Sequence, residues 1–173
     1  MKQTEWIRFT WDLTTLPEIH SELPEHYQIG RATREDDVEL RKVVSSSFTL
    51  DPTWNPAMQE VFQTLESWLD RAWEADASIC LALRHGLRII GAAVLTLEPT
   101  AENHLTPGPC ILMEYRNRGF GTCLLEESLK TLREAGLSAA CAVAKENSPV
   151  TKFLYPKFNS TPAPHDFSPL VVA

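Results

Sequence analysis

One segment of this chain limits its possible folds more than any other. In CILMEYRNRGFGTCLLEESL, an apolar run, Cys110–Met113, passes through a short basic loop into an amphipathic helical pattern. Gly119 and Gly121 have no Cβ to keep a ligand away from the backbone amides. Unpaired amides and the positive dipole end of a helix start suit a diphosphate. Arg116 and Arg118 add charge-assisted donors. The segment therefore predicts an anion site between a strand and a helix.

Two other phosphate-binding motifs fit this segment less well. It lacks the first glycine of the dinucleotide pattern Gly-x-Gly-x-x-Gly, and it falls late in the chain. A P-loop is excluded because no Gly-Lys-Ser/Thr occurs. The pattern that does match, [Gln/Arg]-x-x-Gly-x-[Gly/Ala], is weak by itself and gains specificity from its place between a strand and a helix.

Hydrophobic periodicity predicts the elements around this segment. Alternating residues and short apolar runs predict strands, and apolar residues at helical spacing predict helices. Strands are expected at 7–11, 27–32, 78–84, 88–98, 110–113 and 137–144, and helices at 33–47, 57–75, 119–135 and 148–157. The tail leaves room for one more strand. His85 in the turn of the 78–98 hairpin is expected to be solvated. This order predicts an α+β or mixed-sheet α/β layer architecture.

Composition excludes several classes of protein. The 173 residues are enough for one ordinary domain. A net charge of −7 argues against broad nucleic-acid binding. No apolar run approaches the roughly 20 residues of a membrane span, and the first residues do not resemble a signal peptide. We therefore expect a cytoplasmic protein that binds neither nucleic acid nor membrane.

The four cysteines, Cys80, Cys110, Cys123 and Cys141, are far apart in the sequence and lie among apolar neighbours. No Cys-x-x-Cys spacing occurs, and nothing supports a metal site. We expect buried, reduced thiols that act as small hydrophobic side chains.

Three segments in order resemble one family. EYRNRGFGTCLLEESL resembles the coenzyme-binding motif of the GNAT superfamily of acyl-CoA-dependent N-acyltransferases, and KENSPVTKFLYPKF resembles the next motif. YQIGRATREDDVELRKV is similar to the opening strand and helix of that family. The resemblance covers about residues 27–158. It implies an α/β (α+β) fold of three layers, α/β/α, with a mixed, mostly antiparallel central sheet flanked by helices. Residues 27–173 would form this domain, and 1–26 an N-terminal extension with one candidate strand.

The resemblance also implies a reaction and its residues. An acetyl or other acyl group would pass from acetyl-CoA to a primary amine, on a small molecule or a peptide, by direct attack in a ternary complex. The strand before the loop would splay from its neighbour and hold the pantetheine arm, and the helix start would hold the pyrophosphate. Asn147 would contact the pantetheine or order the helix that follows, and Tyr155 would be the general acid near the sulfur. The implied coenzyme-binding residues are Ile111, Leu112, Met113, Arg116, Arg118, Gly119, Phe120, Gly121, Thr122 and Asn147.

Proton transfer limits the role of Tyr155. A tyrosine of pKa near 10 that protonates a thiolate of pKa near 8.5 works uphill by about 2 kcal/mol. Hydrogen bonding with late proton transfer is therefore the expected role, and a core tyrosine that packs the last helix is the alternative. The amine must also lose a proton before it attacks. Glu98, Glu102 and His104 are the candidate bases, each with the alternative of an ordinary loop residue.

The chain departs from the family pattern near its end. Family members usually have glycine and then an aromatic residue where this chain has Asn159 and Ser160, although asparagine tolerates the left-handed conformation. Only 18 residues follow Tyr155, where the family normally places two strands. We hypothesise that the strand Glu5–Asp12 replaces a missing strand, within the chain or across a homodimer.

Two other functions stay open. An acyl-CoA-binding sensor, or an inactive homologue, would keep the pyrophosphate loop without turnover. An interaction module would use the glycine loop only as a turn and would have no coenzyme affinity. On the acceptor side, Asp51 and Glu60 could attract an amine and Trp54 could cover it, or all three could be ordinary surface residues.

Overall fold

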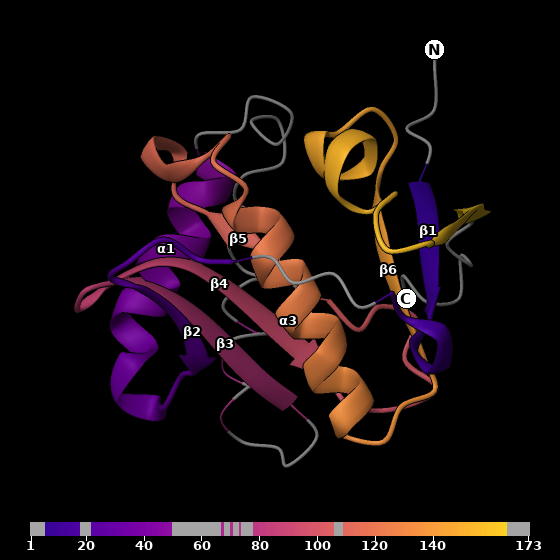
Figure 1. Ribbon diagram of the computed structural model, residues 1–173, viewed down its shortest axis with the longest axis horizontal. Coiled ribbons are helices and arrows are strands. Elements are labelled where there is room, and N and C mark those ends of the chain that lie inside the picture. The colour runs from indigo at the N-terminus through magenta and orange to yellow at the C-terminus, as the bar shows by residue number, and fades with distance from the viewer. Residues whose placement is uncertain are drawn as a thin grey trace.

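The structure consists of two antiparallel sheets. It is a computed structural model that describes residues 6–17, 22–49, 67, 70, 73, 78–105 and 109–165. The larger sheet has the strand order β2-β3-β4-β5, and the smaller has the order β6-β1-β7 (Figure 1). The strands are β1 (Trp6–Asp12), β2 (Tyr27–Arg31), β3 (Ser78–His85), β4 (Arg88–Thr96), β5 (Cys110–Ile111), β6 (Ala139–Lys145) and β7 (Thr161–His165).

Two of the helices in the described part of the chain cover the larger sheet. Helix α1 (Asp37–Thr49) and helix α3 (Phe120–Glu134) lie on opposite faces of the larger sheet, and α3 crosses in front of β4 in Figure 1. This is the three-layer α+β arrangement that the sequence predicts. The apolar stripe of α3 is fully buried, and Leu40, Val43 and Val44 bury one side of α1. Val38, which belongs to the same predicted helix, is exposed.

The start of α1 and the end of α3 are each set by residues close by in the sequence. The Thr33 amide donates to the Asp36 carboxylate at 2.9 Å, so a capping box forms in the turn η2 (Arg34–Asp36) that leads into α1. Helix α3 ends before Gly136, whose φ of 102° lies in the region that glycine enters without a Cβ penalty.

Strand β1 lies in the middle of the smaller sheet. It pairs antiparallel with β6 and with β7, so this early segment of the chain fills the place between two late ones. Its alternation buries Phe9 and Trp11 on the inner face. Proline at two alternate positions of β7, Pro162 and Pro164, suits that strand to the sheet edge, because proline has no amide to donate. The N-terminal strand therefore joins the sheet of its own chain, as the intramolecular form of the hypothesis requires.

The predicted helix at 57–75 lies mostly outside the described residues. Ser67, Asp70 and Trp73 are helical. The Trp73 indole donates to the Asp37 carboxylate at 2.6 Å, and Arg41 pairs with both Asp37 and Asp70, which ties this segment to α1. Asp51, Trp54 and Glu60 fall outside the described residues. Within the described part of the chain, no helix is long and apolar enough to cross a membrane.

Gly91 allows β4 and β5 to lie close together. It stands opposite Ile111 in the pairing of these strands. A Cβ at Gly91 would lie 2.7 Å from the Ile111 Cδ1 and 3.0 Å from the Cys110 carbonyl oxygen. The first contact is with the end of a side chain, which can move, whereas the second is with backbone, so an added side chain strains the β4–β5 contact.

We predict that Gly91→Ala lowers the free energy of unfolding by about 1–3 kcal/mol, because the added methyl overpacks the β4–β5 contact. Urea unfolding followed by circular dichroism measures this. Gly30→Ala is the matched control, since a Cβ at that strand glycine meets nothing within 4 Å. Equal stability of the two variants would contradict this account of Gly91.

Candidate functional site

The two sheets separate where β5 and β6 would otherwise meet. β5 is an edge strand of the larger sheet and β6 an edge strand of the smaller one, and within the described residues they do not pair. The predicted splaying of the strand before the glycine loop is therefore present. That strand is shorter than the predicted 110–113. It ends at Ile111, because Met113–Tyr115 forms a 3-10 turn, η4, in which the Tyr115 amide donates to the Leu112 carbonyl at 2.9 Å.

His104 fastens the two sheets together beside this separation. Its amide donates to the Cys141 carbonyl at 2.7 Å, and the Cys141 amide donates to its Nδ1 at 3.0 Å. Its Nε2 lies 2.9 Å from the Glu98 carbonyl, and its own carbonyl accepts from the Thr96 amide at 3.0 Å. A carbonyl only accepts, so Nε2 carries the proton and Nδ1 is the acceptor. Both nitrogens of this buried ring are therefore engaged in joining β4 to β6.

This arrangement changes the list of candidate bases. His104 is a structural residue, because protonating Nδ1 would break its bond to the Cys141 amide. Glu98 and Glu102 are exposed on the loop that precedes His104. The Glu98 carboxylate accepts from the Thr100 hydroxyl at 3.2 Å. The structure favours neither carboxylate as a base.

The start of α3 presents backbone amides that precede the helix's own hydrogen bonds. The first helical bond runs from the Cys123 amide to the Gly119 carbonyl at 3.2 Å, so the amides of residues 120–122 have no carbonyl behind them within the helix. Gly119 caps the helix with a φ of 83°, a conformation that strongly favours glycine. A Cβ at Gly121 would meet only the Leu154 methyl groups, at 3.8 Å. The helix start therefore lies beside Leu154.

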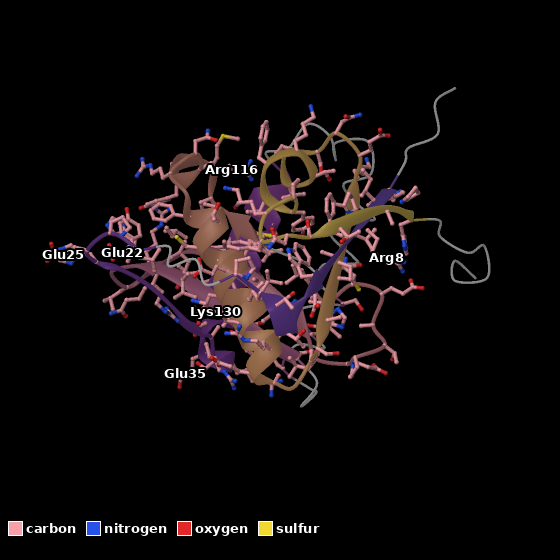
Figure 2. The ribbon with its side chains drawn as sticks, turned by 45° about the vertical axis from the view of Figure 1, so that its right-hand side comes forward. Arg8, Glu22, Glu25, Glu35, Arg116 and Lys130 are labelled. Atoms are coloured by element: carbon pink, nitrogen blue, oxygen red, sulfur yellow. The ribbon has the colours of Figure 1, made fainter. Side chains whose placement is uncertain are left out.

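The two arginines of the loop have different surroundings. The Arg116 Nε donates to the Ile111 carbonyl at 3.0 Å, which ties the loop to the end of β5. Figure 2 shows Arg116 at the end of the molecule where α3 begins. Arg118 is exposed, with its guanidinium 5.5 Å from the centre of the Tyr115 ring. Arg118 is thus the better placed of the two to meet an anion from solvent.

An aromatic cluster supports the loop, and sequence analysis missed it. The Tyr27 ring stacks on His85 at 4.4 Å and on Phe120 at 4.7 Å. The His85 Nδ1 lies 3.0 Å from the Tyr115 hydroxyl. His85 is exposed, as expected for a turn residue, but it is also a member of this cluster. The sequence does contain an aromatic residue at each end of the loop, Tyr115 and Phe120. Hydrophobic periodicity, however, does not indicate that these residues contact His85 in the hairpin.

The predicted pantetheine contacts lie at the end of β5. Ile111 and Leu112 are buried, whereas Met113 is 47% exposed. The Leu112 amide still donates to the Ile90 carbonyl of β4, at 2.9 Å. β5 is the edge strand of the larger sheet, and its Ile111 carbonyl accepts from the Arg116 Nε. The pantetheine contacts themselves stay a prediction.

The segment after β6 forms a π-helical turn, η5 (Val150–Leu154), in place of the predicted helix over 148–157. The Tyr155 amide donates to the Val150 carbonyl five residues back, at 2.7 Å. Asn147 is exposed, with a φ of 64°, and reverses the chain into the turn. The Ser148 and Thr151 hydroxyls both donate to the Lys145 carbonyl, at 2.8 and 2.6 Å, so they fix η5 to the end of β6.

Tyr155 is buried between the two sheets. Its ring packs edge to face on Phe9, at 5.6 Å, and on Trp11, at 5.7 Å. Burial raises the pKa of Tyr155, and the nearby Cys110 thiol raises it further. Because Cys110 belongs to β5, the phenol lies near that strand while the ring rests on β1. The core role of Tyr155 is therefore confirmed, and its role as general acid stays a prediction.

The four cysteines are not joined by disulfides, and two of them are buried as predicted. Cys80 and Cys110 are buried, and burial raises the pKa of each to about 12. These two thiols are therefore neutral at neutral pH and poor nucleophiles. Cys123 and Cys141 are only partly buried.

Comparison with known proteins agrees with the predicted fold and family. The family model described as Acetyltransferase (GNAT) family matches residues 45–158. No curated protein gives a significant match.

Several solved structures share the fold. A GCN5-related N-acetyltransferase from Sphaerobacter thermophilus has a TM-score of 0.64 and 16% identity, over 94% of this chain and 50% of that one. A GNAT-family acetyltransferase from Colwellia psychrerythraea has a TM-score of 0.64 and 13% identity, over 94% and 54%. A functionally unknown conserved protein from Staphylococcus epidermidis has a TM-score of 0.63 and 15% identity, over 94% and 59%. The chain thus spans little more than half the length of these proteins.

We predict that His104→Ala lowers the free energy of unfolding by about 1–3 kcal/mol, because it leaves the partly buried Cys141 amide and Glu98 carbonyl without their side-chain partner. His104→Asn should recover part of this loss, since its amide oxygen can replace Nδ1 as the acceptor. Chemical unfolding measures both, with Glu102→Gln as the exposed control from the same loop. No difference between His104→Ala and the control would contradict the joining role of His104.

Proposed function

Because this chain belongs to the acetyltransferase (GNAT) family, we propose that it is an N-acetyltransferase that moves an acetyl group from acetyl-CoA to a primary amine. The observation that carries the proposal is the helix start at residues 119–122, beside the point where β5 and β6 separate. Its amides precede the helical hydrogen bonds and point in the direction of the positive dipole end.

In this proposal the coenzyme follows the glycine loop and the edge of β5. The amides of Phe120, Gly121 and Thr122 bind the pyrophosphate, and the Arg118 guanidinium adds a charge-assisted donor. Arg116 contributes its positive charge while it anchors the loop to Ile111. The pantetheine arm lies along residues 111–113, where amide and carbonyl groups of an edge strand can pair with its amides. Asn147 orders the turn that faces this arm.

The reaction is a direct attack of the neutral amine on the thioester carbonyl. The carbon–nitrogen bond forms, the oxyanion is stabilised by a backbone amide of the β5 segment, and the carbon–sulfur bond then breaks. The ammonium proton of the substrate is lost to a base or to water before the attack. After the attack the nitrogen is cationic and gives up a second proton, and the departing coenzyme thiolate takes up one proton. No metal is needed in this sequence of steps.

The surroundings of Tyr155 define what it can contribute. Burial raises its pKa, so the phenol is protonated at neutral pH and gives up its proton less readily than a tyrosine in water. Full transfer to the thiolate is then even less favourable than for an unperturbed tyrosine. We therefore assign Tyr155 a hydrogen bond to the developing thiolate, with complete proton transfer late or from solvent.

The acceptor is proposed only as a class. A net charge of −7 favours a cationic amine, on a small molecule or a peptide, over a nucleic acid. The acceptor-side candidates Asp51, Trp54 and Glu60 remain part of this proposal. Four reduced thiols are in keeping with a cytoplasmic location.

We predict that Gly121→Glu abolishes acetyl-CoA binding measured by calorimetric titration. The new carboxylate would lie at the pyrophosphate position and repel it. An acidic residue in the first turn stabilises a helix, so this variant should fold at least as well as the parent chain. Lost binding could not then be attributed to lost structure.

Gly121→Ala is the matched control. Its methyl meets Leu154 only at ordinary contact distance, so micromolar binding should persist. Release of the coenzyme thiol with a panel of amines then tests turnover. Binding without thiol release would favour an acyl-CoA sensor. No binding of acetyl-CoA or CoA by the folded parent chain would overturn the proposal.

A further inference from the structure

The N-terminal strand holds Tyr155 in place through Trp11. The Trp11 side chain is fully buried, and its indole ring meets the Tyr155 ring edge to face with an interplanar angle of 87°. Its Nε1 donates to the Lys157 carbonyl at 2.9 Å, two residues after Tyr155. One side chain of β1 thus contacts the ring of the tyrosine and binds the backbone that follows it.

The backbone around Tyr155 lacks the regular hydrogen bonds of an α-helix. The residues before Tyr155 form a π-helical turn, in which the Tyr155 amide donates to the Val150 carbonyl. The next residues turn sharply, because Phe158 and Asn159 both have a φ of 60°. A left-handed conformation is uncommon for a bulky residue and costs about 1–2 kcal/mol. Such a segment keeps one geometry only when contacts from outside restrain it.

Two contacts supply that restraint on the side after Tyr155. The Ser160 hydroxyl donates to the Tyr155 carbonyl, which closes the turn locally. The Trp11 indole, on strand β1, donates to the Lys157 carbonyl, and the two residues are 146 positions apart in sequence. The second contact ties the turn directly to β1.

We propose that Trp11 is a positioning residue for the reaction, which acts by holding the Tyr155 hydroxyl where the coenzyme sulfur binds. This inference rests on the proposed function. It gives β1 a role in the reaction, because the strand supplies both the packing surface and the hydrogen bond that orient the phenol. Errors of about 1 Å in the placement of a reacting group can lower a rate by as much as 100-fold.

Trp6 serves as an internal comparison. It lies on the same strand but alternates to the other face, away from Phe9 and Trp11. Its replacement should therefore change the strand without changing the restraint on Tyr155.

The test is a double-mutant cycle of Trp11→Phe and Tyr155→Phe, read as kcat in the thiol-release assay. Trp11→Phe keeps an aromatic ring but removes the indole N–H. We expect Tyr155→Phe to lower kcat roughly 100-fold and Trp11→Phe to lower it roughly 10-fold. In the Tyr155→Phe background, Trp11→Phe should have little further effect, since the hydroxyl it positions is gone.

Three measurements separate positioning from a general loss of structure. Acetyl-CoA affinity by calorimetry should be unchanged in Trp11→Phe, so the loss appears in kcat and not in binding. Leu13→Val, a buried substitution next to the same strand, should lower the melting temperature with kcat preserved. Trp6→Phe should leave kcat at the parent value.

The possible outcomes are distinct. An equal loss of kcat from Trp11→Phe in both backgrounds, or an unchanged kcat in the single variant, would overturn the positioning role. A parent chain that releases no thiol with any amine would instead refute the proposed function.

Discussion

The separation of β5 from β6 is the constraint on which the rest of the structure depends. Two edge strands that do not pair must each have their backbone groups satisfied in another way. At one end His104 supplies such partners: its carbonyl and its Nε2 bond to Thr96 and Glu98, and its amide and its Nδ1 bond to Cys141. At the other end the strands diverge, and the glycine loop and the π-helical turn η5 begin. In the proposed function, this separation is where the pantetheine arm of the coenzyme binds.

The two sides of this separation are supported differently. The loop and the start of α3 rest on the larger sheet, through the bond from Arg116 to Ile111 and the aromatic cluster around Tyr27. Tyr155 rests on the smaller sheet, against Phe9 and Trp11 of β1. A coenzyme bound between them would contact both sheets. The N-terminal strand therefore belongs to the site as much as to the core.

Local chemistry explains which parts the sequence could predict. The strand–loop–helix segment and the alternation of β1 each depend on neighbours in sequence, and both formed as expected. The joining role of His104 and the stacking of His85 on Tyr27 depend on residues far apart in the chain, which periodicity does not reveal. The strand at 110–113 was predicted too long because Met113 is apolar yet begins a 3-10 turn. Asn159 takes the left-handed conformation that its residue type allows, but nothing in the sequence indicated that Phe158 does so too.

Hydrogen–deuterium exchange with and without acetyl-CoA tests the central claim most directly, because it reports on the amides that the account assigns to the coenzyme. The account predicts slower exchange at residues 111–113 and 119–123, where the pantetheine and pyrophosphate would bind, and in η5 around Tyr155. Exchange in β2 and β3, on the far side of the larger sheet, should be unchanged. Coenzyme binding that protects β2 and β3 but leaves the start of α3 unaffected would contradict the assignment of the site to the separation between β5 and β6.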